Sequence, residues 1–199
     1  MTPPCPKPKL APVLTNGQLA RGPELRNVLA APRRSVLEAI VVRLGNGKHA
    51  RPEVARLTRE DGLVGDRWAA FRPVAQRQLT LMDARVVRML LAERARNIGA
   101  QGDLIAHEEL DLPGDNLVFD HPTSVVALPP GTRLRVGGAV IETNDVPHMG
   151  CKKFEARFGS DALAWVNDEA HYDLRLRGIH AVVCDEGEIR LSDPIEVIA

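Results

Sequence analysis

Residues 132–143, Thr132-Arg133-Leu134-Arg135-Val136-Gly137-Gly138-Ala139-Val140-Ile141-Glu142-Thr143, predict an antiparallel β-hairpin. Polar and apolar residues alternate in the first arm, as in a strand with one buried face. The second arm is rich in β-branched residues, and Gly137-Gly138 supplies the backbone freedom that a tight turn requires. The chain therefore contains sequentially adjacent, paired strands.

Further strand-like runs flank this hairpin on both sides. They cover residues 36–44 (closed by Gly45-Asn46-Gly47), 54–58, 79–82, 116–119, 124–128, 178–184, and 188–191 running on to 195–198. One helix is expected after Asp83, a capping residue, with Gly99 available to end it. Two more are expected over 151–158 and 160–171, broken at Gly159. Many short strands with a few helices predict a mainly β fold, a mostly antiparallel barrel.

Length and composition bound the class of protein. A chain of 199 residues suits one domain with a substantial core. Lys+Arg 26 against Asp+Glu 26 leaves no net charge to favour nucleic acid or a membrane surface. Three cysteines without a secretory signal indicate reduced thiols in the cytoplasm, and no apolar run reaches the roughly 20 residues of a membrane span. Residues 1–34, rich in proline and basic residues, are expected to form an extended or partly ordered arm, followed by one domain over 35–199.

Cys151 is the residue with the clearest chemical potential. It precedes Lys152 and Lys153 where a loop turns into a predicted helix, so backbone N–H groups and positive charge favour its thiolate. A thiolate can attack electrophilic sulfur or bind a soft metal. The alternative is a small buried residue, since free cysteine is often buried.

Four segments, in this order, resemble the MOSC domain, the module at the C-terminus of molybdenum-cofactor sulfurases that also occurs as stand-alone bacterial proteins. They are Gly65-Asp66-Arg67-Trp68, Pro113-Gly114-Asp115-Asn116-Leu117, Cys151-Lys152-Lys153-Phe154 and Leu176-Arg177-Gly178-Ile179-His180-Ala181-Val182. The resemblance spans about residues 36 to 198. It implies a closed β-barrel of the MOSC type, with the cysteine at a cleft for a molybdenum cofactor (molybdopterin) or a sulfur cargo.

The resemblance also assigns roles to individual residues. Cys151 would be the catalytic residue and the molybdenum ligand, because molybdenum accepts a soft thiolate. The cofactor-binding residues would be Asp66, Arg67, Gly114, Asn116, Lys152 and Arg177. Arg67 and Arg177 would clamp the phosphate or pterin through planar guanidinium donors, Asn116 would meet the pterin edge, and Gly114 would let the backbone approach.

Structural roles remain open for several of these residues. Asp66 and Arg67 can form an ion pair that fixes a loop, and Asn116 can bond to its own backbone. His148, Cys151 and His171 can also be interpreted as zinc ligands, but their spacing is too open to be specific. The chain departs from many MOSC domains in placing Gly150, rather than proline, before the cysteine.

Two functions in particular follow from the resemblance. The first is a molybdenum-dependent reductase of small N-hydroxylated substrates, served by an electron-donor or cofactor-supplying protein. The second is a sulfur carrier or cofactor-delivery protein that holds a persulfide on Cys151. A third alternative is a barrel that binds a small ligand without chemistry. None of these involves nucleic acid or a membrane.

Overall fold

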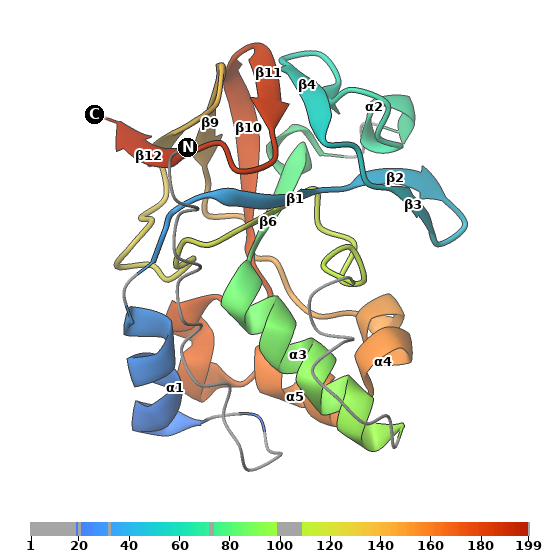
Figure 1. The fold of residues 1–199 in the computed structure, drawn as a ribbon. Helices are drawn as coiled ribbons and strands as arrows, with labels where there is room; N and C mark the ends of the chain where they lie inside the picture. Colours follow the sequence, from blue (N-terminus) through green and yellow to red (C-terminus); the bar gives the residue numbers. More distant parts are fainter. Residues whose placement is uncertain (1–18, 20, 32, 72–73, 99–108, 199) are drawn as a thin grey trace, which may run out of the picture.

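The computed structural model describes residues 19, 21–31, 33–71, 74–98 and 109–198 (Figure 1). Its main sheet has seven strands in the order β1-β7-β6-β10-β9-β8-β12. These strands are β1 (Leu37–Ile40), β6 (Leu79–Asp83), β7 (Leu117–Phe119), β8 (Arg133–Val136), β9 (Ala139–Thr143), β10 (Ile179–Asp185) and β12 (Ile195–Ile198). Neighbouring strands are antiparallel except β6 and β7, which are parallel. The predicted mostly antiparallel arrangement is confirmed.

The sheet curls into a nearly closed barrel. Its two edge strands meet at the isolated bridge between Val36 and Pro194, where the N–H of Leu37 donates to the carbonyl of Asp193 at 2.9 Å. A smaller sheet adds β4 (Val54–Thr58), β5 (Gly62–Leu63) and β11 (Gly187–Arg190), and β2 (Val42–Gly45) pairs with β3 (Lys48–Ala50).

Alternating side chains of the barrel strands serve two cores. Leu117 and Phe119 point into the barrel interior, whereas Val118 between them belongs to a second apolar cluster outside it. This alternation follows from the two-residue period of a strand. The barrel is therefore filled on the inside and covered on the outside.

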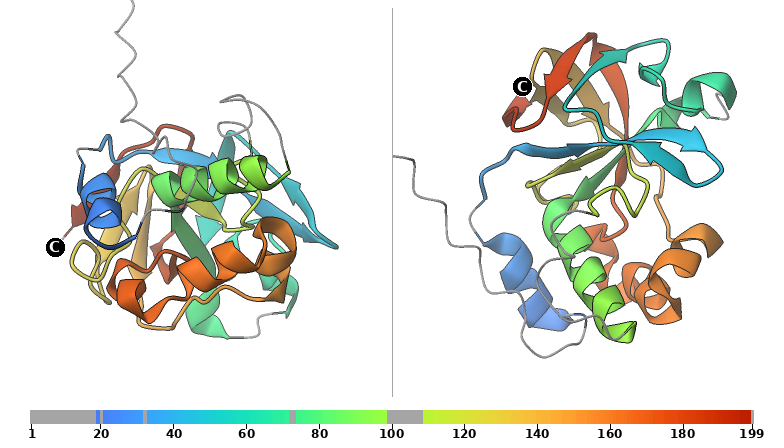
Figure 2. Two further views of the ribbon diagram at one scale, coloured as in Figure 1. Left: turned by 90° about the horizontal axis from the view of Figure 1, so that it is seen from below. Right: turned by 45° about the vertical axis from the view of Figure 1, so that its right-hand side comes forward.

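Helices cover one end and face of the barrel in both Figure 1 and the right-hand view of Figure 2. They are α1 (Gly22–Ala30), α3 (Ala84–Asn97), α4 (Lys152–Phe158) and α5 (Ser160–Val166), and their apolar side chains form most of the outer cluster. The predicted cap of α3 is confirmed, because the Asp83 side chain accepts a hydrogen bond from the N–H of Arg85. Short elements α2 (Trp68–Phe71), η1 (Ala75–Arg77) and η2 (Glu169–Leu174) complete the chain's regular structure in the described residues.

Four predicted elements differ from the structure. The strand predicted over 36–44 is divided into β1 and β2, which belong to different sheets. Residues 124–128 form a turn rather than a strand, because the Ser124 hydroxyl and carbonyl accept hydrogen bonds from the N–H groups of Ala127 and Leu128. The helix predicted over 160–171 stops at Val166, and Asp168 then caps the separate 3₁₀ helix η2. The run 188–198 splits between two sheets, and the left-handed residue Ser192 lies at the break.

Part of the segment expected to be an extended or partly ordered arm is helical. Residues 22–30 form α1, and its Leu25 and Leu29 are buried in the outer cluster. Just beyond it, the Arg33 guanidinium pairs with the buried Asp83 carboxylate at 2.7 Å. The remaining residues of the arm, apart from 19, 21, 31, 33 and 34, lie outside the described residues.

Candidate functional site

Cys151 is the N-cap of α4, as the sequence predicted, and its side chain is exposed. Its backbone is extended (φ −130°, ψ 177°), so the chain enters the helix directly after it. Cys184, by contrast, is only partly exposed on β10. Cys151 is therefore the more accessible thiol of the two.

The surroundings of Cys151 favour its anion. Burial raises the pKa of the thiol, but the N–H groups of Phe154 and Lys153 and the charges of Arg177 and Lys153 outweigh burial, and the pKa is lowered overall. The pKa of Cys184 is raised instead, by burial and by the nearby Glu142 carboxylate. The two thiols thus differ in the direction that a reactive and an inert cysteine require.

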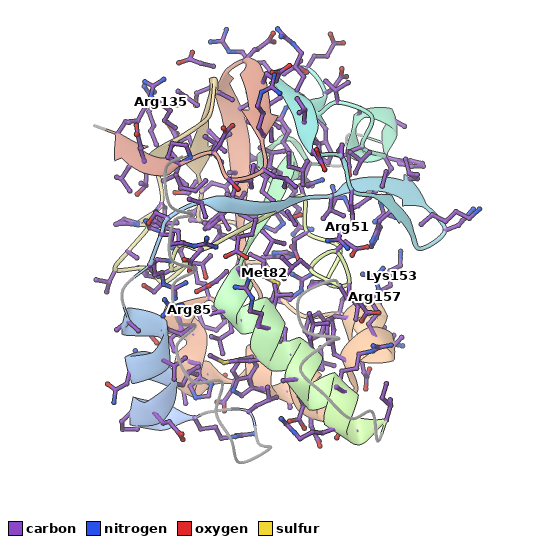
Figure 3. The ribbon with its side chains drawn as sticks, in the orientation of Figure 1. Arg51, Met82, Arg85, Arg135, Lys153 and Arg157 are labelled. Atoms are coloured by element: carbon purple, nitrogen blue, oxygen red, sulfur yellow. The ribbon has the colours of Figure 1, made fainter. Side chains whose placement is uncertain are left out.

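Positive charge continues along α4 away from the thiol. Lys153 and Arg157 are four residues apart, so they lie on the same side of the helix, and Figure 3 shows them next to one another below Arg51. The Arg157 guanidinium donates to the carbonyls of Leu112 and Pro113 at 2.8 and 3.0 Å. Its charge is held by neutral acceptors, which leaves the face beside Cys151 basic.

Gly150, the residue before the cysteine, lies where neighbouring side chains leave no room for a larger residue. A Cβ added there would lie 2.7 Å from the Leu163 side chain and 3.0 Å from Val166. The N–H of Gly150 donates to the Asn167 amide oxygen at 2.8 Å, and the Asn167 amide donates back to its carbonyl at 3.2 Å. Asn167 thus holds the loop that precedes Cys151. The sequence did not reveal this role because Asn167 and Gly150 are 17 positions apart.

Arg177 connects α4 to the end of the barrel. It is buried, its Nη1 donates to Asp115 Oδ2 at 2.6 Å, and its guanidinium lies 5.1 Å from the centroid of the Phe154 ring. Its Nε is buried without a hydrogen-bond partner. Arg177 therefore lies near Cys151, as the predicted site required, and part of its hydrogen-bonding capacity is unused.

Asp66 and Asn116 form a separate, internally satisfied junction. Asp66 pairs with Arg43, at 2.8 Å, and not with Arg67. The Asn116 amide donates to Asp66 at 2.9 Å and its oxygen accepts from the N–H of Thr80 at 3.1 Å. Both side chains are buried, so their polar atoms tie strands together. Burial raises the pKa of Asp66, but bonds from Arg43 and from two N–H groups outweigh it and lower the pKa.

The other predicted residues are placed differently again. Arg67 is exposed, and its N–H donates to the carbonyl of Arg43. Gly114 has the positive φ of 82° that favours glycine, but a Cβ there would lie 2.8 Å from the Arg157 guanidinium. The space above it is thus occupied by protein. Lys152 is exposed beside Cys151.

A hollow of about 170 Å³ opens close to Cys151. Met149, two residues before the thiol, is part of its wall, as is Arg177. Its walls are mainly apolar, and they come from residues 125, 130, 144–149, 166, 171–172, 175 and 177–179. The hollow therefore lies between the loop before α4 and the segment that leads into β10.

Within the described residues, no group of three or more His, Cys, Asp and Glu side chains is arranged to hold a metal ion. His148 faces Asp115, at 3.7 Å, and His171 faces Asp168, at 3.9 Å. The described part of the chain also contains no helix long and apolar enough to cross a membrane.

Comparison with solved structures identifies the type of fold. A hypothetical protein of known crystal structure superposes with a TM-score of 0.57 at 22% identity, over 84% of this chain and 69% of that one. YiiM from Escherichia coli superposes with a TM-score of 0.53 at 22% identity, over 85% and 71%. YuaD from Bacillus subtilis gives 0.54 at 14% identity, over 83% and 97%.

These likenesses, all below 25% identity, show a shared architecture, and the chain has a MOSC-like fold. No protein-family model matches the sequence, and no curated protein sequence does. The predicted barrel with a few helices is thus confirmed. Any proposal about activity or cofactor has to come from the residues of the candidate site.

Proposed function

We propose that this protein binds a molybdopterin-type cofactor beside α4 and reduces small N-hydroxylated compounds. The observation that carries the proposal is the exposed Cys151 thiol, whose pKa is lowered, in a MOSC-like fold. A thiolate is a soft ligand of the kind that molybdenum accepts.

The residues around Cys151 fit such a group in part. Cys151 would ligate molybdenum, and Lys152 and Arg177 would offer positive charge to its anionic parts. Arg177 Nε is buried without a partner, and a guanidinium can donate from Nε and a terminal nitrogen to one anion. Asp66 and Asn116 contribute by holding strands together, because their hydrogen bonds are already made within the protein. When bound, the cofactor supplies a metal centre that can accept oxygen from an N–O bond.

The chain's own contribution is binding and orientation. Asn167 holds the backbone of Gly150, which fixes the backbone just before Cys151 at the start of α4. Arg67 remains a candidate contact for the phosphate because its side chain is exposed. Reduction of an N–O bond consumes two electrons, so the proposal includes an electron-donor protein, and the basic face of α4 is where an acidic donor would be attracted.

The test is made on protein produced in a host that supplies molybdenum cofactor. We expect molybdenum by elemental analysis and pterin by fluorescence, near one per chain. Cys151→Ser should keep the pterin but lose the reduction of an N-hydroxylated compound, whereas the matched variant Cys184→Ser should keep both. Absence of pterin and molybdenum from the parent protein, or full reductase activity in Cys151→Ser, would overturn the assignment.

A sulfur carrier is the second candidate, and the exposure of Cys151 favours it. An external acceptor can reach a persulfide there, and the outer sulfur then passes to the acceptor while the Cys151 thiolate leaves. This reaction requires no bound metal. Treatment with cyanide should release about one thiocyanate per chain from protein loaded with persulfide, and none from Cys151→Ser. Equal release from Cys184→Ser and parent is the expected control.

A further inference from the structure

One edge of the His148 ring is buried against the carboxylate of Asp115. His148 also forms part of the wall of the hollow described above. Its Nδ1 and the Oδ1 of Asp115 are 3.7 Å apart, and each is buried without a hydrogen-bond partner. That distance is too long for a hydrogen bond. Because buried polar atoms are nearly always bonded, a shift of less than about 1 Å that joins the two satisfies both.

The surroundings hold the two groups in this orientation. The other carboxylate oxygen of Asp115 accepts from Arg177 at 2.6 Å. Gly178 has a φ of 97°, and glycine is required there because a Cβ would lie 2.2 Å from the carbonyl oxygen of Leu81; His148 Nδ1 would be at an ordinary contact distance of 3.5 Å from it. The His180 ring lies 4.5 Å from the His148 ring, and its Nδ1 is 3.1 Å from the carbonyl of Val146.

The acid determines which ring nitrogen of His148 carries hydrogen. An ionised carboxylate can only accept, so Nδ1 of a neutral ring is the donor and Nε2 is the acceptor. The ring is neutral because burial, with the charges of Arg177 and His180, lowers the pKa of His148 well below its usual value. The side chain is 13% exposed, and the buried Nδ1 is not part of that exposed surface.

The charges around the hollow limit the kinds of ligand that it can bind. Arg177 lies on the wall, and so does Arg175, whose guanidinium donates to the carbonyls of Thr123 and Ser124. Two guanidinium groups disfavour a cation. A carboxylate on the ligand could not donate a hydrogen bond to Nε2 of His148, because both groups are acceptors. The exposed Asp145 on the wall offsets one of these two positive charges, and Arg177 is already paired with Asp115, so little net charge remains to attract an anion.

We propose that the hollow binds a small, uncharged, mainly apolar molecule whose hydroxyl group donates a hydrogen bond to Nε2 of His148, with Asp115 as the positioning residue. Apolar groups of the wall, among them Val146, Met149 and Ile179, would contact the body of the ligand. Nothing in this binding requires a metal or Cys151, so it goes beyond the proposed function.

The test compares phenol with anisole, which has a similar shape but no hydroxyl hydrogen, on metal-free protein. Titrations followed by the methyl resonance of Met149 should show phenol binding at least about tenfold more tightly, as expected for one hydrogen bond in an apolar site. His148→Phe should bring the phenol affinity down to that of anisole. The matched control His121→Phe, outside the hollow, should keep the preference.

Equal affinities, no binding of either probe at millimolar concentration, or a preference that survives in His148→Phe would overturn the proposal. If His148→Phe does not fold, ¹⁵N spectra of the parent decide instead: His148 must carry its hydrogen on Nδ1, and the Nε2 resonance must move with phenol. This test uses protein without molybdenum. A failure of the phenol test therefore leaves the cofactor proposal unaffected, and a failure of the cofactor test leaves the phenol proposal unaffected.

Discussion

Replacing Leu25 by alanine tests whether α1 is part of the folded domain. The Leu25 side chain is 0% exposed and packs in the outer apolar cluster with residues of α3 and α5. Removal of a buried leucine side chain leaves a cavity and costs about 2 to 5 kcal/mol of unfolding free energy. For a chain of this size, that corresponds to a fall in melting temperature of roughly 4 to 20 °C.

The matched control is Leu44→Ala, because Leu44 is 57% exposed. That change should stay within about 0.5 kcal/mol of the parent. Urea unfolding of all three proteins, with refolding checked, gives the free energies. If Leu25→Ala is no more destabilised than Leu44→Ala, then α1 does not pack on the domain as described.

Three further predictions concern reactivity, backbone packing and pH. Iodoacetamide should alkylate Cys151 faster than Cys184 at neutral pH, with the difference shrinking as pH rises past both pKa values; peptide mapping measures this, and equal labelling contradicts it. Gly187→Ala should lower stability by more than about 2 kcal/mol, since its methyl group would overlap the carbonyl of Gly138; an unchanged urea midpoint contradicts it. The pKa of Asp66 is lowered in the folded protein, so its contribution is present above the unfolded pKa of about 3.9 and is lost as pH falls through the folded value. Asp66→Asn should therefore lose less stability than the parent as the pH falls below about 4 in urea unfolding, and an identical acid profile contradicts it.

The sequence predicted the elements whose signals are local. The hairpin at Gly137-Gly138 and the Asp83 cap are both specified within a few residues, and the structure has both. The helix α1 also has a local signal, Pro23 in its first turn and Leu25 four residues before Leu29, which the surrounding prolines obscured. Local chemistry was thus sufficient for the hairpin and for the start of α3, and composition masked it in α1.

The candidate site was less predictable because its contacts are long-range. Asp66 has an arginine neighbour in sequence, yet it pairs with Arg43, since the β2 strand brings that side chain to it. Gly150 departs from the expected proline because Asn167 and α5 pack against it. No spacing rule reveals a partner that only the tertiary fold brings close.

The bridge between Val36 and Pro194 has a consequence for how the molecule folds. This bridge joins the first and the last strand of the barrel. Closing the barrel therefore requires a loop that contains almost all of its remaining strands. Contacts of such wide separation form late and slowly. During synthesis, the barrel can close only after β12 has left the ribosome. Until then β1 presents an unpaired edge, and a chain stalled before that point would be the form most exposed to aggregation.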